Sequence, residues 1–317
     1  MSTPTTSTGA TALATGAHAD DTPAGRGAAG NRVPDGAPRG ARRGPVLTAV
    51  VYVLLALVTF LCLMPFVWLV RSSLMGTSQI FSYPPEWIPA PFQWDNFTGA
   101  LSAAPFARYA ANTLLLVVLI VPGALLSSSA AAFAFSRLAW RGRDLAFAAL
   151  MSGLMLPYAA TLIPTFIGWQ ELGLTNTYWP LALPPWFAAG AAFNVFMLRQ
   201  FFSQMPADLD NAMYVDGGTP WTVYWRIALP LNKGPMTLVG IFTTIAVWND
   251  LLNPLIYLSD PDKFTLSLGL ASFRSLYSSQ WGYLMAASLL VILPIMVLFA
   301  FAQKAIMENL ALSGLKG

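Results

Sequence analysis

The sequence predicts an all-α polytopic membrane protein with six transmembrane helices. Of its 317 residues, 56% are hydrophobic and 10% are charged, and the mean hydropathy is +0.58. A soluble domain normally carries about 25% charged residues, so this chain is too apolar for a soluble fold. Apolar runs of about 20 residues, the length of a helix that crosses a bilayer, recur along the chain.

Six apolar runs are long enough to be membrane-spanning helices. They cover residues 47–70, 111–136, 145–167, 182–203, 236–258 and 282–303. In the fourth run, Pro184 and Pro185 stand near the start. Because proline lacks a backbone N–H, we expect this helix to begin later or to be kinked. Together the runs predict one transmembrane domain over residues 46–317.

Residues 1–45 have a different composition from the rest of the chain. They are rich in Ala, Gly, Thr, Ser and Pro and contain almost no large apolar side chains. Such a segment cannot bury enough surface to offset the entropy lost on ordering. We therefore expect a disordered tail on the cytoplasmic side.

The basic residues predict the orientation in the membrane, because cytoplasmic loops carry an excess of Lys and Arg. With the tail inside, 13 of the 17 basic residues are cytoplasmic and 4 are outside; without the five in the tail, the balance is 8 against 4. Both termini are therefore expected in the cytoplasm. The four outer residues are Arg71, Arg108, Lys263 and Arg274.

Two outer segments, residues 71–110 and 259–281, are longer than simple turns. Both are rich in Pro, Trp and Tyr. Aromatic residues of this kind form belts at the membrane–water interface. The alternative is a docking surface for an extracytoplasmic protein, and the length of the segments favours docking.

A polar insert, residues 206–230, separates the fourth and fifth runs and is predicted to form two short helices. Pro206 can occupy the first turn of a helix, where its missing N–H is not needed. Asp208 and Asp210 then lie near the positive end of the helix dipole. The apolar face at spacings of three and four consists of Leu209, Ala212 and Met213.

The second half of the insert carries signals for a turn and a new helix. Gly217 and Gly218 are expected to end the first helix, because glycine accepts the left-handed conformation. Thr219 can cap the second helix and Pro220 can begin it, while Pro230 is expected to end it. Its apolar side is expected to consist of Trp221, Tyr224, Trp225 and Ala228.

Two interpretations of this insert remain open from the residues alone. The first is an amphipathic connector that lies in the membrane interface. The second is a lever that projects into a groove of a partner protein and transmits force. The loop that contains it, residues 204–235, is therefore the main candidate site.

Several kinds of chemistry are excluded by the residue inventory. The single histidine, His18, is in the tail, so neither a Ser/His/Asp triad nor a several-ligand zinc site is expected. The single cysteine, Cys62, cannot form an internal disulfide. No Gly-rich phosphate-binding loop is present around Lys233, so the chain has no such route to ATP hydrolysis. No cofactor, metal or nucleic acid is expected.

Asp250 is the one ionisable residue near the centre of a predicted span. A charge at that depth costs about 2.5–3.5 kcal/mol on insertion scales, so it should face protein or water. It either pairs with Trp248, Asn249 or a partner subunit and shapes the helix, or it lines or gates a pore.

The insert resembles the cytoplasmic signature loop of permease subunits of binding-protein-dependent ATP-binding-cassette importers. That signature reads Glu-Ala-Ala, three residues ending in Asp, then Gly, with a closing Leu-Pro. Asn211-Ala212-Met213 stands in the Glu-Ala-Ala positions, so the signature glutamate is replaced. Asp216, Gly217 and Leu229-Pro230 match. Charge for a partner contact is then left to Asp208 and Asp210.

The resemblance extends from about residue 46 to the end and is closest to maltose-type carbohydrate permeases. The matching motifs, in chain order, are Pro65–Trp68, Asn96-Phe97, Arg108-Tyr109, Asn112-Thr113, Arg137–Gly142, Pro164, Asn176-Thr177, Phe193-Asn194, Leu198–Phe202, Trp248–Asp250 with Pro254, and Leu312–Gly317. No single motif is decisive, but their ordered set is specific.

The resemblance implies a type I importer permease in a bacterial inner membrane that forms half of a sugar or oligosaccharide pore. Its implied partners are a second permease subunit, two ATP-binding subunits that hydrolyse ATP, and an extracytoplasmic sugar-binding protein that receives loop 259–281. The implied ATPase-coupling residues are Asp208, Asp210, Asn211, Ala212, Met213, Asp216 and Gly217. The pore-lining candidates are Trp248, Asn249 and Asp250.

An ion-coupled secondary transporter is the main alternative. Such proteins usually contain internal repeats and broken helices around ion sites at the bilayer midplane. No convincing repeat of one half in the other is found here, and one buried aspartate is little for ion coupling. A membrane enzyme is disfavoured by the missing catalytic residues.

Overall fold

The computed structural model describes residues 45–187, 191–276 and 280–314. Except for Pro45, the predicted tail lies outside the described residues, as do residues 315–317 of the C-terminal motif. The chain divides into two units, one that ends at Val58 and one that begins at Thr59. The packing contacts given below lie within the unit that begins at Thr59.

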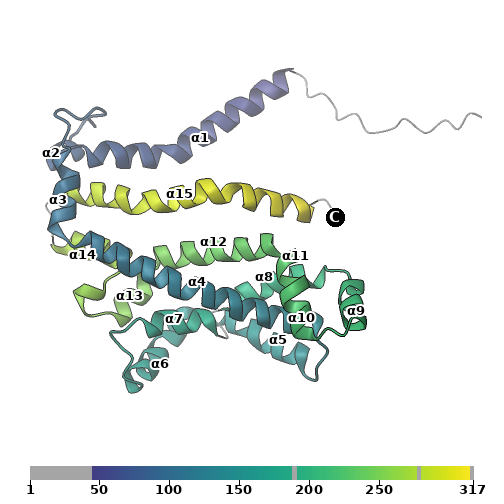
Figure 1. Ribbon diagram of the computed structural model, residues 1–317. Helices are drawn as coiled ribbons and strands as arrows, with labels where there is room; N and C mark the ends of the chain where they lie inside the picture. Colours follow the sequence, from purple (N-terminus) through teal and green to yellow (C-terminus); the bar gives the residue numbers. More distant parts are fainter. Residues whose placement is uncertain (1–44, 188–190, 277–279, 315–317) are drawn as a thin grey trace, which may run out of the picture. The chain divides into compact units, whose positions relative to one another are not determined.

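The described chain is built from helices, and none of its described residues forms a strand, in agreement with the predicted all-α class (Figure 1). The helices are α1 (Pro45–Ser73), α2 (Thr77–Ile80), α3 (Asp95–Ala103), α4 (Phe106–Arg137), α5 (Arg143–Ser152), η1 (Gly153–Met155), α6 (Tyr158–Glu171), α7 (Trp179–Trp186), α8 (Ala192–Ser203), α9 (Ala207–Val215), α10 (Pro220–Val223), η3 (Tyr224–Ala228), α11 (Leu229–Leu231), α12 (Lys233–Asn249), α13 (Leu252–Tyr257), η4 (Pro261–Lys263), α14 (Leu266–Leu276) and α15 (Trp281–Gly314).

Three helices in the described part of the chain are long and apolar enough to cross a membrane unbroken. They are Pro45–Ser73, Phe106–Arg137 and Trp281–Gln303, which correspond to the first, second and sixth predicted runs. The third run, 145–167, is a pair of helices that passes the same test together but is bent by 101°. The bend falls at Pro157, which begins α6 as its N-cap and cannot continue the preceding helix.

The fourth and fifth predicted runs are not continuous helices. A kink or a later start was expected in the fourth run, but the fifth was expected to be unbroken. In the fourth, α7 ends at Trp186 directly after Pro184 and Pro185, as the proline argument anticipates, and α8 begins at Ala192. Residues 188–190 lie outside the described part. In the fifth, α12 ends at Asn249 and α13 begins at Leu252. An apolar run shows total hydropathy but cannot show such a break, so the count of six crossings stays a prediction.

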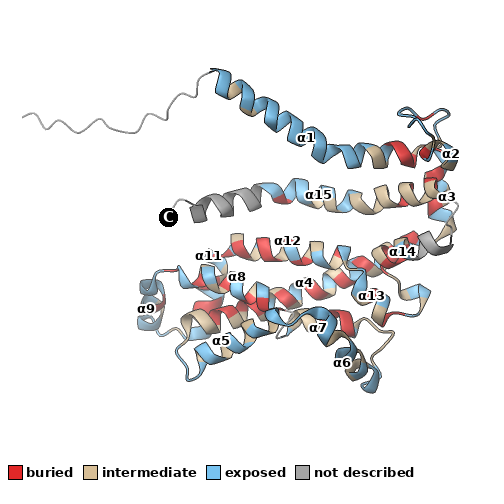
Figure 2. Cartoon of the chain, turned by 180° about the vertical axis from the view of Figure 1, so that it is seen from behind, coloured by how far each residue is buried: buried red, intermediate tan, exposed pale blue. Residues whose placement is uncertain are grey.

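Helix α4 is the central packing element of the unit that begins at Thr59. It contacts α8, α12, α7 and α14 along its length. Its residues enter three apolar clusters: Phe106 and Tyr109 join Trp248, Leu116 and Ile120 join Leu181, and Ala132 and Phe133 join Phe202. Buried positions accordingly recur along α4 and α8, whereas α9 is largely exposed (Figure 2).

One close approach shows how this packing is achieved. A Cβ placed on Gly123 of α4 would lie 2.1 Å from Nε1 of Trp186. The missing side chain of glycine therefore lets the indole of α7 lie directly against the backbone of α4. Small residues serve the same purpose at many helix contacts in membranes.

The two outer segments contain regular structure. Residues 71–110 include α2 and α3, and residues 259–281 include η4 and α14, with residues 277–279 outside the described part. Asn96 of α3 is buried and donates from Nδ2 to the carbonyls of Ser73 and Met75 at 2.9 and 3.0 Å. The first segment is thus tied to the end of α1 by an amide in one of the sequence motifs.

Candidate functional site

The loop of residues 204–235 is called the elbow below. Its first helix forms where the sequence predicts it. Helix α9 covers Ala207–Val215, and Asp208 and Asp210 lie in its first turn. Pro206 is its N-cap, with extended backbone, and not a residue of its first turn. The predicted place of Pro206 was therefore wrong by one position. The missing N–H of proline is tolerated both in the first turn of a helix and at the residue before it, so the rule does not distinguish the two.

The glycine turn after α9 has the hydrogen bonds of a Schellman motif. The N–H of Gly218 donates to the carbonyl of Met213 at 2.8 Å, and that of Gly217 to Tyr214 at 3.1 Å. Gly217 has φ +79°, a conformation that side chains with a Cβ resist. The predicted end of the first helix is therefore confirmed.

The second helix begins as predicted but does not end at Pro230. The hydroxyl of Thr219 accepts a hydrogen bond from the N–H of Thr222 at 3.3 Å, and Pro220 occupies the start of α10. A π-helical turn, η3, follows, and Pro230 lies within α11. The wider turn shifts the hydrogen-bonding pattern before Pro230, so the chain continues through a proline that would end an α-helix.

The aromatic residues of the second helix divide into buried and exposed ones. Tyr224 is buried and its hydroxyl lies 2.7 Å from that of Ser129 on α4. Burial raises the pKa of Tyr224 above its ordinary value, although the hydrogen bond with Ser129 offsets part of that rise. Ala228 is buried as predicted, but Trp221 and Trp225 are exposed, so the predicted apolar side is only half covered.

An ion pair with Arg137 holds α9 against the end of α4. The guanidinium of Arg137 approaches Oδ2 of Asp210 with Nη2 at 2.7 Å and Nε at 2.8 Å. Its Nη1 donates to the carbonyl of Met205 at 2.8 Å, and Nη2 lies 3.4 Å from that of Pro206. The side chains of Arg137 and Asp210 are only 9% and 10% exposed.

The predicted coupling residues therefore separate into an anchor and an exposed surface. Asp210 is the buried residue of α9, and its Oδ1 has no hydrogen-bond partner in the described chain. Met213 is half-buried. The remaining predicted residues are exposed: Asp208, Asn211, Ala212, Asp216 and Gly217. Asp210 thus faces this chain, while five of its predicted companions face away from it.

The three pore-lining candidates do not share one environment. Trp248 is buried and donates from Nε1 to the carbonyl of Val291 on α15 at 3.1 Å. Asn249 is exposed, and its Nδ2 donates to Ile245 one turn earlier at 2.9 Å. Asp250 lies at the break between α12 and α13.

Asp250 precedes Leu251, the N-cap residue of α13, and its carboxylate binds the first turn of that helix. Its Oδ1 accepts from the N–H of Asn253 at 3.2 Å, and its Oδ2 accepts from the Nδ2 of the same residue at 2.9 Å. Asn253 in turn accepts from the hydroxyl of Tyr158, the first residue of α6, at 2.7 Å. A polar chain therefore links the two helix breaks, and the partner of Asp250 is Asn253 and neither Trp248 nor Asn249.

A second polar cluster forms around residues 259–266, a segment predicted to be outside the membrane. Arg108 pairs with Asp262, and the amide of Asn112 donates to the carbonyls of Asp262 and Phe264 at 2.8 and 3.0 Å. Across the same segment, Asn176 accepts from the N–H of Asp260 at 3.1 Å. The sequence motifs contained Arg108, Asn112 and Asn176, but nothing in their spacing showed that they meet the segment 259–266.

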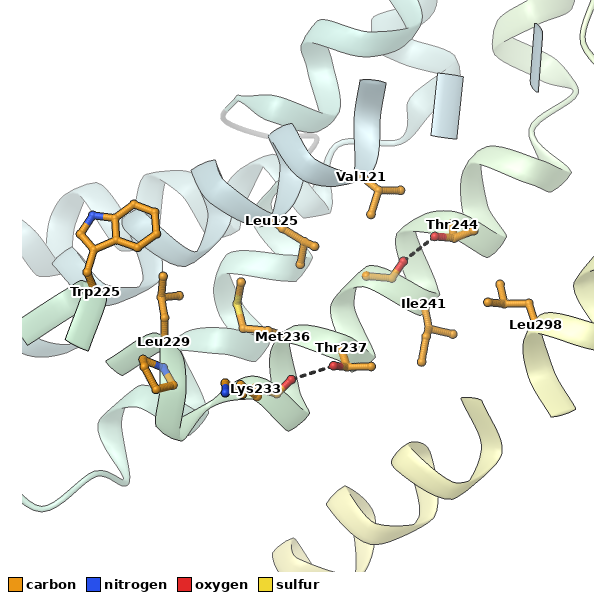
Figure 3. Close-up of a pocket in the computed structure, with 12 residues that line it drawn as sticks. Val121, Leu125, Trp225, Leu229, Lys233, Met236, Thr237, Ile241, Thr244 and Leu298 are labelled. Atoms are coloured by element: carbon orange, nitrogen blue, oxygen red, sulfur yellow. Dashed lines mark hydrogen bonds between the residues drawn. The ribbon is translucent and has the colours of Figure 1, made fainter. Parts of the chain in front are cut away.

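A cavity of about 710 Å³ lies between α4, α12 and α15 beside the elbow (Figure 3). Its walls are mainly apolar. The hydroxyls of Thr237 and Thr244 donate to backbone carbonyls one turn earlier, at 2.9 and 2.8 Å, and Lys233 lies at the elbow end. The polar side chains of this lining are therefore few: two threonines and Lys233.

Comparison with known proteins gives a consistent result. Residues 22–308 match the family model described as the inner membrane component of binding-protein-dependent transport systems. The chain is 30% identical to the probable ABC transporter permease protein YurM of Bacillus subtilis, over 84% of this chain and 88% of that protein. It is 29% identical to the arabinooligosaccharides transport system permease protein AraQ of Halalkalibacterium halodurans, over 87% and 99%.

The fold also has a counterpart among solved structures. A chain in the crystal structure of a bacterial ABC transporter involved in the import of the acidic polysaccharide alginate superposes with a TM-score of 0.71. The match covers 84% of this chain and 99% of that chain, with 20% sequence identity. At that identity the likeness concerns the fold.

Proposed function

Because the chain belongs to the family of inner membrane components of binding-protein-dependent transport systems, we propose that it is one of two permease subunits of an ATP-driven importer for a sugar or oligosaccharide. It forms half of the translocation pore in the bacterial inner membrane. The relative AraQ, named for arabinooligosaccharide transport, supports the substrate class. The particular sugar is left to the extracytoplasmic binding protein.

One observation carries the coupling part of this proposal. Helix α9 presents Asp208, Asn211 and Asp216 to solvent while Asp210 anchors it to the bundle. A helix that projects from the bundle, yet is fixed at one buried point, suits a groove in a partner protein. Val215, the last residue of α9, is 87% exposed and is therefore open to contact by a partner.

The partner at the elbow is an ATP-binding subunit. This chain has no phosphate-binding loop, so the nucleotide is hydrolysed by the two ATP-binding subunits and the chain itself is not an enzyme. A second, different permease completes the pore. The extracytoplasmic binding protein docks on the outer segments 71–110 and 259–281.

Cysteine crosslinking tests the proposed docking. Cys62 is first replaced by alanine, and Val215→Cys is introduced for reaction with a short maleimide that carries a photoactivatable group, in membranes that contain the whole transporter. We expect a crosslink to the ATP-binding subunit. The matched control is Val118→Cys, on the part of α4 predicted to span the membrane and 70% exposed, which should give none.

Two results would remove this proposal. One is a complete absence of the ATP-binding subunit from the Val215→Cys products, with the transporter shown to be assembled by co-purification. The other is an equal yield from Val118→Cys, since that would mean that the crosslink does not report on the elbow.

A further inference from the structure

We propose that Arg137 is the positioning residue that makes the elbow and helix α4 move as one body. Through its pair with Asp210, it transfers the movement of α9 into the membrane helices. This inference rests on the proposed docking of an ATP-binding subunit at α9. It concerns a different contact, which lies entirely within this chain.

Helix α9 has few other contacts that hold it in place. Of the nine residues of α9, Asp210 is the buried one. Met213 is half-buried beneath the glycine turn and packs against the apolar cluster around Phe202, and the remaining side chains of α9 are exposed. A helix with so few packed side chains takes its position mainly from its charged anchor and from the chain at its two ends.

The shape of the Arg137 side chain allows it to hold several groups at once. A guanidinium is planar and carries five N–H donors in a rigid fork. Arg137 directs this fork at one carboxylate oxygen of Asp210 and at the carbonyls of Met205 and Pro206. Those carbonyls lie in the link between α8 and α9. One side chain therefore fixes α9 and the link before it to the end of α4.

The position of Arg137 connects this anchor to the membrane helices. It is the last residue of α4, where the negative end of the helix dipole favours a cation. The following residue, Leu138, is extended, so the helix cannot lengthen or shift without moving the guanidinium. Because α4 packs against α8, α12, α7 and α14, a displacement that reaches its end is passed to most of the bundle.

The test measures whether α9 and α4 keep their separation when nucleotide binds. Nitroxide spin labels on Val118→Cys and Val215→Cys, in the Cys62→Ala background, give distance distributions by pulsed electron paramagnetic resonance. The sample is the assembled transporter, without nucleotide and with ATP plus vanadate. We expect the mean distance to change by less than about 2 Å, the size of ordinary helix adjustments.

Variants of the ion pair supply the second arm. In Arg137→Gln, the distance distribution is expected to broaden and to shift with nucleotide, while the crosslink from Val215→Cys to the ATP-binding subunit persists. Arg137→Lys keeps the charge and should restore part of the narrow distribution. Arg143→Gln is the matched control, because Arg143 pairs with the exposed Asp144 nearby; its distribution should equal that of the parent.

A double variant separates positioning from general damage. If Arg137 acts through Asp210, the double variant Arg137→Gln/Asp210→Asn should broaden the distribution no more than Arg137→Gln alone. An additive broadening would assign the two residues independent roles and overturn the proposal.

Two further outcomes would also overturn it. One is a change of about 5 Å or more in the mean distance between the two labels when nucleotide binds to the transporter with an intact Arg137. That is the scale of a helix sliding by one turn. The other is an Arg137→Gln distribution that equals the parent's in both states. If the Arg137→Gln transporter does not assemble, the change in label distance on nucleotide binding in the protein with Arg137 intact decides alone whether α9 and α4 move together. Loss of the Val215→Cys crosslink in the parent would instead refute the proposed docking, so the two failures are distinguishable.

Discussion

The two ends of α4 carry the same kind of ion pair in opposite surroundings. At the last residue, the side chains of Arg137 and Asp210 are enclosed by protein, whereas near the first residue those of Arg108 and Asp262 are 56% and 65% exposed. The helix has 32 residues, which at about 1.5 Å per residue places the two pairs about 45 Å apart. One helix therefore links a region fixed by a buried charge to a region whose charges face solvent.

Burial changes what each pair contributes. Water screens an exposed pair, which is worth about 0–1 kcal/mol. Loss of one partner of a buried pair costs about 3–5 kcal/mol, because the other charge is left without compensation. At the Arg108 end, the amides of Asn112 and Asn176 also hold the segment 259–266. At the Arg137 end, the guanidinium is the main attachment of α9. The first region tolerates the loss of a charge, whereas the second does not.

The largest expected effect comes from removing the buried cation. Arg137→Met should lower the free energy of unfolding by about 3–5 kcal/mol, because Asp210 is then buried without a counter-charge. The measurement is reversible denaturation of the purified protein in detergent micelles. The double variant Arg137→Met/Asp210→Leu removes both charges and should recover a large part of the loss. If the double variant is as unstable as Arg137→Met alone, the stabilising effect of Arg137 does not come from its ion pair with Asp210.

Replacement of the turn glycine should have the next largest effect. Gly217→Val forces a β-branched residue to adopt φ +79°, at a cost of at least about 1–2 kcal/mol for the left-handed conformation. We expect membrane insertion to persist and ATP-dependent uptake to fall, since the end of α9 is displaced. Uptake is measured in cells whose own binding protein and partner subunits are present.

The control for the turn is Gly168→Val. Gly168 lies within α6, and a Cβ there would meet nothing within 4 Å. The residue change is the same, but without the backbone strain. Equal uptake by the Gly217→Val variant and the parent would count strongly against a mechanical role for the elbow.

The smallest expected effect is at the exposed pair. Asp262→Asn should change the free energy of unfolding by less than about 1 kcal/mol, and the difference should shrink as salt is added. The carbonyl of Asp262 still accepts from Asn112, so the segment stays attached. Parallel denaturation at low and high salt tests this. A loss as large as that of Arg137→Met would remove the contrast between the two ends of α4.

Local signals in the elbow were readable from the sequence because they act between near neighbours. Thr219, Pro220 and Gly217 each specify a backbone conformation on their own, and all three occupy the predicted positions. Pro230 misled the prediction, because the wider π-helical turn before it depends on how Tyr224 and Ala228 pack, and a local rule does not include packing.

The anchoring role of Asp210 could not be predicted in the same way. It depends on a residue 73 positions away, and neither periodicity nor spacing brings Arg137 to it. The one available signal was that Arg137 ends an apolar run directly before a polar loop. Similarly, Asp250 was singled out by its charge, but its hydrogen bonds with Asn253 in the first turn of α13 required the helix break to be known.

The distance between labels at positions 118 and 215 in the Arg137→Gln transporter shows directly whether Arg137 fixes α9 to α4. We expect a broad distribution that responds to ATP plus vanadate, against a narrow and unresponsive one in Arg143→Gln. Two identical, narrow distributions would mean that α9 keeps its place without the buried charge, and the proposed link between the elbow and α4 would be wrong.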